Sequence, residues 1–130
     1  YSQFGSNFLK TMLRLASERT SLSVVSDQIG TPTYAVDLAE VLLKIVTSKT
    51  KTFGIYNFSN EGQCSWYDFA HEIFLQKDIT IDLQAISTKL YPTPAKRPAY
   101  SVLDKSKIKA TFGVNINDWK TSLNNCLKHY

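Results

Sequence analysis

The residues best suited to chemistry lie in one proline-rich stretch, from Tyr91 to Asp104. Three of its prolines fall within seven residues, and this excludes a helix interior or a central strand, because each proline fixes its own φ and lacks a backbone donor. The stretch should therefore be stiff and extended, and it carries Lys96 and Arg97. A guanidinium held in this way suits bidentate binding of a phosphate or a carboxylate. The alternative is a surface connector with two solvated cations.

The distribution of charge favours an anionic small molecule as the ligand. The net charge is +4, but residues 1–88 carry 7 basic and 9 acidic side chains, whereas residues 89–130 carry 8 and 2. The basic end includes the proline-rich stretch. A nucleic-acid-binding module is disfavoured, because the chain has only three arginines and its lysines are not interleaved with exposed aromatic residues.

Other reactive side chains have simpler explanations. His71 and Glu72 match the start of a zinc-protease motif, but Leu75 stands where the second histidine is required, so that metal site is excluded. Cys64 has no histidine in a recognisable partner motif, and a loop before a helix explains it better than a nucleophile does. No metal site is predicted. The remaining acidic candidates are interpreted as turn or helix-surface carboxylates: Asp27, Asp37 and Glu40.

Apolar periodicity predicts a mixed α/β order that could position the cations, within a single region covering residues 1–130. Helices are expected over residues 8–16, 35–46 and 66–74, in a short segment that Asp104 caps and Gly113 ends, and after Asn117. Strands are expected over residues 22–25, 53–58 and 79–85.

Three details of these elements are informative. The helix over residues 35–46 is apolar over so broad a surface that we expect contact on more than one side, for example with a sheet from outside this chain. Ser65 and Asp68 resemble a capping box. Trp66 and Trp119 lie at core spacings and are interpreted as packing residues rather than stacking platforms.

Composition places the chain among soluble globular proteins of the cytoplasm. Charged residues make up 20% and apolar residues 43%, and no apolar run approaches the ~20 residues of a membrane span. The two cysteines lack C-x-x-C spacing, so reduced thiols in a cytosolic protein are expected.

Five segments, in order, resemble the dTDP-4-dehydrorhamnose reductase family, which belongs to the extended short-chain dehydrogenase/reductases. Together they cover nearly the whole chain. The segments are residues 7–12, 25–33, 37–39, 57–66 and the proline-rich stretch 91–104.

The resemblance implies the C-terminal, substrate-binding part of an enzyme with a Rossmann-type cofactor domain. That enzyme would use NADPH or NADH to reduce dTDP-4-dehydro-L-rhamnose to dTDP-L-rhamnose, a precursor of cell-surface polysaccharide. The expected partners are the dTDP-sugar, the N-terminal Rossmann domain and, in a homodimer, a second copy of the chain. No nucleic acid or membrane is expected.

The catalytic and cofactor-binding residues of the family are missing from this sequence. No two of the five glycines are spaced as G-x-G, and no tyrosine is followed four residues later by lysine. We therefore expect no catalytic residue, no bound cofactor and no reductase activity in the isolated chain.

Three residues match substrate-binding positions of the family. Arg97 matches the arginine that reaches the diphosphate. Asn7 matches an asparagine that faces the nucleotide-sugar, although it could equally cap a helix. Gln28 matches a loop that lines the cleft, although an ordinary turn would also explain it.

Two other functions stay open at this point. The chain could be a non-catalytic subunit, like the relative of this family that regulates methionine adenosyltransferase. It could also belong to a reductase or epimerase for another nucleotide sugar. A Tyr-x-x-x-Lys pair upstream of Tyr1 would distinguish an enzyme from a binding subunit.

Overall fold

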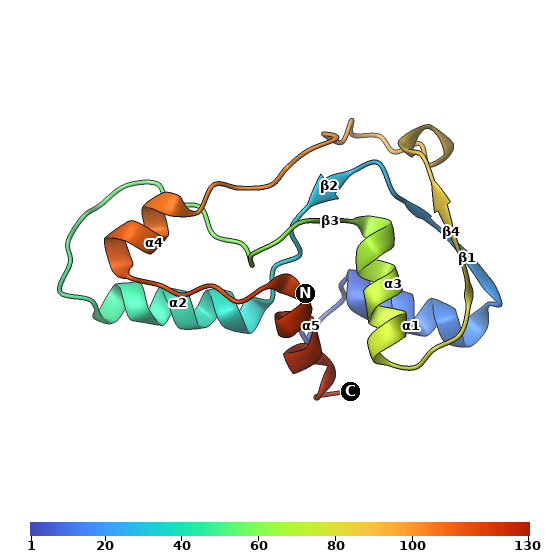
Figure 1. The fold of residues 1–130 in the computed structure, drawn as a ribbon, viewed down its shortest axis with the longest axis horizontal. Helices are drawn as coiled ribbons and strands as arrows, with labels where there is room; N and C mark the ends of the chain where they lie inside the picture. Colours follow the sequence, from blue (N-terminus) through green and yellow to red (C-terminus); the bar gives the residue numbers. More distant parts are fainter.

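The computed structural model describes residues 1–130 and confirms the mixed α/β class (Figure 1). The helices are α1 (Phe8–Glu18), α2 (Ala35–Thr47), α3 (Trp66–Gln76), α4 (Ser106–Phe112) and α5 (Trp119–Leu127), with a 3-10 turn η1 (Thr88–Leu90). The strands are β1 (Ser21–Val25), β2 (Ile29–Gly30), β3 (Cys64–Ser65) and β4 (Asp82–Ile86). None of the helices combines the length and the apolar character needed to cross a bilayer.

The strands form two small sheets. β1 runs parallel to β4, with Leu22 opposite Leu83, and β2 runs antiparallel to β3, with Ile29 opposite Ser65. Helices α1 and α3 lie together beside β1 and β4 at one end of the molecule, while α2 and α4 lie at the other end (Figure 1). The segment between η1 and α4 crosses from one end to the other (Figure 1), and the proline-rich stretch within it runs beside β2.

One main hydrophobic core stabilises the end of the molecule that contains α1 and α3. The inward faces of α1, α3 and α5 supply its fully enclosed side chains, which include Leu9, Phe69, Ile73 and Leu123. Burial of such side chains stabilises a fold by roughly 1.5–3 kcal/mol each. A smaller cluster, formed by Val41, Ile108 and Val114, joins α2 to α4 and the segment after it.

Local capping signals are confirmed. The Ser65 hydroxyl accepts a hydrogen bond from the Asp68 N–H (3.0 Å), and the Asp68 carboxylate accepts one from the Ser65 N–H (2.8 Å), as a capping box requires. Gly113 ends α4 in the left-handed region (φ 58°), and its N–H donates to the Lys109 carbonyl.

Two predicted features are wrong. Residues 53–58 form no strand, and Phe53 and Ile55 are 91% and 87% exposed rather than buried. An extended segment gains strand hydrogen bonds only from a neighbouring strand, and this chain places none beside it. Asp104 accepts from the Ser106 N–H, but Lys105 occupies the N-cap position of α4 and makes no side-chain cap.

The outer surface of α2 is apolar and uncovered. We call Leu42, Leu43 and Val46 the α2 apolar face; they are 52%, 66% and 75% exposed. The exposed Phe53 and Ile55 follow directly after this helix in the chain. Contiguous exposed apolar surface of this kind marks an interaction site or an aggregation liability. The broad apolar surface predicted for this helix is thus present, and nothing in the chain covers it.

We expect the 130-residue chain to self-associate as its concentration rises, because association removes the α2 apolar face from water. Sedimentation velocity over a concentration series measures this directly. Leu43→Glu combined with Val46→Glu should shift the chain toward monomer. Leu75→Glu is the matched control, since Leu75 is 62% exposed on a different helix. A wild-type chain that stays monomeric throughout would contradict the expectation.

Candidate functional site

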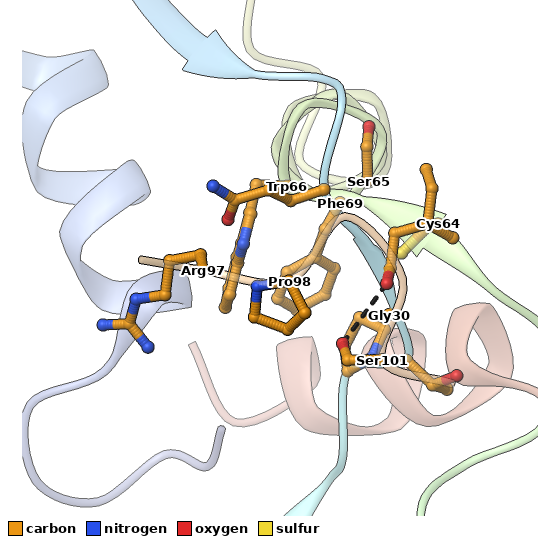
Figure 2. Close-up of a pocket in the computed structure, with 12 residues that line it drawn as sticks. Gly30, Cys64, Ser65, Trp66, Phe69, Arg97, Pro98 and Ser101 are labelled. Carbon is orange, nitrogen blue, oxygen red and sulfur yellow. Dashed lines mark hydrogen bonds between the residues drawn. The ribbon is translucent and has the colours of Figure 1, made fainter. Parts of the chain in front are cut away.

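Three segments that are distant in sequence enclose one pocket. Residues 28–32 around β2, residues 64–69 at the start of α3 and residues 97–101 of the proline-rich stretch contribute its walls (Figure 2). Its cavity volume is about 300 Å³. Ligand sites commonly span roughly 300–1,000 Å³, so this pocket has room for part of a small organic molecule.

The backbone of Ile29 brings the three segments together. Its N–H donates to the Ala99 carbonyl (2.8 Å), and its carbonyl accepts from the Ser101 N–H (2.9 Å). Ile29 also pairs with Ser65 in the β2–β3 sheet. Hydrogen bonds therefore fix the proline-rich stretch on one edge of β2 and the start of α3 on the other.

Gly30 permits the close approach of these segments. A Cβ at this position would lie 2.9 Å from the Ser101 hydroxyl oxygen, which is closer than real Cβ contacts allow. The Ser101 hydroxyl donates to the Ile29 carbonyl (3.2 Å), the hydrogen bond drawn in Figure 2. The absence of a side chain at Gly30 thus leaves room for the Ser101 hydroxyl in the position from which it makes this bond.

Arg97 lies at the pocket as an exposed cation. It forms none of the four ion pairs in the chain, and no side chain of the chain neutralises it. Pro98 follows it and also lines the pocket. The guanidinium is therefore available to an anion that enters the pocket, on a backbone with little conformational freedom to lose.

Gln28 lines the same pocket, and a hydrogen bond to Thr88 fixes its side-chain amide. Its Nε2 donates to the Thr88 hydroxyl oxygen (3.0 Å), while that hydroxyl donates to Asp27 (2.6 Å). The hydrogen bond from the Thr88 side chain lowers the pKa of Asp27, so this carboxylate stays ionised and keeps the chain of bonds intact. Asp27 is a turn carboxylate, as predicted.

Asn7 lies outside the pocket. It is the N-cap of α1: its Oδ1 accepts from the Lys10 N–H (3.2 Å), and its Nδ2 donates to the Ser2 carbonyl (2.8 Å). The structure therefore brings Gln28 and Arg97 together and does not place Asn7 with them. A role for Asn7 toward a ligand stays a prediction.

Trp66 differs from its prediction as a packing residue. Trp119 is buried as expected (4% exposed), but Trp66 is 45% exposed and forms part of the pocket wall (Figure 2). Trp66 is the first residue of α3, so its ring extends beyond the core that Phe69 and Ile73 fill from the following turns. Its place directly after the N-cap Ser65 is the sequence signal that could have indicated this.

Cys64 also lines the pocket, but its surroundings disfavour a role as a nucleophile. The residue is 8% exposed, and burial raises the pKa of its thiol to about 12. A catalytic cysteine needs the opposite shift, because the thiolate is the reactive form. His71 lies on the exposed surface of α3, and no cluster of three or more His, Cys, Asp or Glu side chains is placed to hold a metal ion.

Comparisons with known proteins agree on one family. The whole chain, residues 1–130, matches the family model of the RmlD substrate binding domain. The chain is 46% identical to a dTDP-4-dehydrorhamnose reductase of Aggregatibacter actinomycetemcomitans, over 96% of this chain and 46% of that protein. It is 41% identical to the spore coat polysaccharide biosynthesis protein SpsK of Bacillus subtilis, over 98% of this chain and 44% of that protein.

A solved structure gives the same result. The dTDP-4-dehydrorhamnose reductase of Bacillus anthracis, crystallised in complex with NADP, superposes on 98% of this chain with a TM-score of 0.91 and 35% identity. The superposition covers 44% of that protein. The chain thus spans less than half the length of the relatives it matches.

We expect Cys64 to react slowly with maleimide in the folded protein. With a pKa of about 12 against an ordinary 9.0, its thiolate at pH 8 is about a thousandfold scarcer than that of an ordinary thiol. The labelling rate should keep rising with pH beyond 9. Chain unfolded in guanidinium, in which both cysteines are ordinary, is the control. Rapid labelling of the folded protein at pH 7 would show an activated thiolate and restore the nucleophile hypothesis.

Proposed function

Because this chain belongs to the RmlD substrate binding domain family, we propose that it forms the substrate-binding part of a dTDP-4-dehydrorhamnose reductase. The whole enzyme would reduce the 4-keto group of dTDP-4-dehydro-L-rhamnose and release dTDP-L-rhamnose for cell-surface polysaccharide. We place this enzyme in the cytoplasm, where two reduced cysteines are expected.

The observation that supports this function most directly is the unpaired Arg97 in the pocket. A diphosphate carries negative charge over several oxygens, and a guanidinium can donate to two of them at once. The basic C-terminal third of the chain adds long-range attraction for the same anion. We therefore assign the diphosphate of the substrate to Arg97, with Gln28 as a further polar contact from the β2 segment of the pocket wall and Asn7 as a predicted one from the start of α1.

The residues of this chain do not fit the pyrophosphate of a dinucleotide. Such a site needs a glycine-rich turn whose free amides open a helix. Here amides in the first turns of α1, α3 and α5 already donate to the cap side chains of Asn7, Ser65 and Asp118. We therefore propose that NADPH or NADH binds to the part of the enzyme outside this chain, where hydride and proton transfer would also occur.

The same remaining part is the proposed cover for the α2 apolar face. Residues 53–58 are mostly apolar and form no strand within this chain, so they could pair with the edge of a sheet supplied from outside it. A Rossmann domain has such a sheet, and its docking would bury both features at once. A homodimer contact elsewhere on the surface stays a prediction.

Arg97→Ala in the full-length protein should raise the KM for dTDP-4-dehydrorhamnose roughly ten- to hundredfold, because a charge-assisted hydrogen bond is worth about 1.5–3 kcal/mol. Arg97→Lys should recover only part of the loss, since an ammonium lacks the planar fork. Steady-state kinetics with both substrate and cofactor varied measures the effect, and the KM for NADPH should change little.

Lys96→Ala is the matched control, because it removes the neighbouring exposed cation of the same stretch. Its KM should stay within about threefold of wild type, as expected for a screened surface charge. If Arg97→Ala lowers thermal stability while the KM stays unchanged, Arg97 is a structural residue and the assignment of the diphosphate is wrong.

A further inference from the structure

Trp66 is the large aromatic side chain that the main core leaves partly open to the pocket. It is 45% exposed, whereas Phe69, three residues later on the same helix, is 2% exposed. Leaving so much indole surface in water forgoes stabilisation that full burial would give. An aromatic ring exposed in a pocket wall offers a binding surface for flat ligands.

The Trp66 ring is held firmly from the core side. Its centroid lies 4.9 Å from that of Phe8 at a tilt of 48°, and Phe8 in turn stacks on Phe69 at 5.6 Å. Phe69 meets the buried Trp119 edge to face at 5.9 Å. This row of rings fixes Trp66 before any ligand arrives, so little side-chain entropy remains to be lost on binding.

The charged groups near Trp66 determine where an anion can bind. At the start of α3, the Asp68 carboxylate already accepts hydrogen bonds from the N–H and the hydroxyl of Ser65. A second negative charge beside this carboxylate would be repelled. The cation of the pocket is Arg97, on the proline-rich stretch. A ligand that fits both features therefore presents its phosphates to Arg97 and a flat ring to Trp66.

We infer that Trp66 is the surface on which the pyrimidine ring of a nucleoside diphosphate stacks while Arg97 binds its diphosphate. This inference rests on the proposed function, because it takes the ligand to be a nucleotide sugar. Stacking uses the face of the base and does not read its edges, so Trp66 contributes affinity for thymine and uracil nucleotides alike. Selection between them must then come from contacts other than stacking.

The test compares Trp66→Phe with Trp66→Leu in the full-length protein, using calorimetric titration with dTDP, UDP and inorganic pyrophosphate. Both variants keep an apolar side chain against Phe8, but only phenylalanine keeps a flat ring. Trp66→Leu should weaken dTDP and UDP by a similar factor, about five- to a hundredfold, and leave pyrophosphate unchanged. Trp66→Phe should retain most of the nucleotide affinity. Leu75→Ala, at the far end of the same helix, is the control that should change none of the three.

Arg97→Ala, measured in parallel, separates failure of this inference from failure of the proposed function. If Arg97→Ala weakens both dTDP and pyrophosphate while Trp66→Leu binds dTDP like wild type, stacking on Trp66 is refuted and the diphosphate site stands. If Trp66→Leu weakens pyrophosphate as much as dTDP, Trp66 acts through the shape of the pocket and the inference also fails. If Arg97→Ala changes neither ligand, the pocket is not the nucleotide site and both proposals fall.

Discussion

The candidate site depends on hydrogen bonds made by the backbone of Ile29. The N–H and carbonyl of this residue bond residues 99 and 101 on one side, while β2 pairs with β3 on the other. Because backbone groups make these bonds, the spacing between the proline-rich stretch and the start of α3 does not depend on the identity of any side chain at position 29. Arg97 and Trp66 therefore face one pocket although 31 positions separate them in the sequence.

A buried network of hydrogen bonds connects the two ends of the molecule. The Asp37 carboxylate of α2 accepts hydrogen bonds from the Asn60 amide and the Ser122 hydroxyl of α5, and the Asn60 Oδ1 accepts from the Tyr34 N–H (2.8 Å). A buried carboxylate without such donors would be strongly destabilising. The network thus orients α2, and with it the α2 apolar face, relative to the core that supports the pocket.

Most features set by neighbouring residues were predictable from the sequence, with the Asp104 cap of α4 as the exception, and features set by distant contacts were not. The capping box at Ser65, the stop at Gly113 and the apolar stripe of α1 depend on residues within one or two turns, and all are present. Asp37 was interpreted as a surface carboxylate and is buried, because its partners lie 23 and 85 residues away. The strand predicted over residues 53–58 failed for the same reason: a pattern of side chains cannot show whether a partner strand is present.

The side chains of the pocket are better suited to binding than to bond-making chemistry. Arg97 and Gln28 contribute a permanent cation and a neutral amide, and burial raises the pKa of the Cys64 thiol, which lowers its reactivity. Groups of this kind bind parts of a substrate that do not react. In the proposed enzyme, binding energy gained there would hold the reacting sugar in place against catalytic groups outside this chain, which would lower the entropic part of the barrier. An arginine on a proline-stiffened backbone and an indole fixed by neighbouring rings suit that task, because less conformational freedom is then lost each time the substrate binds.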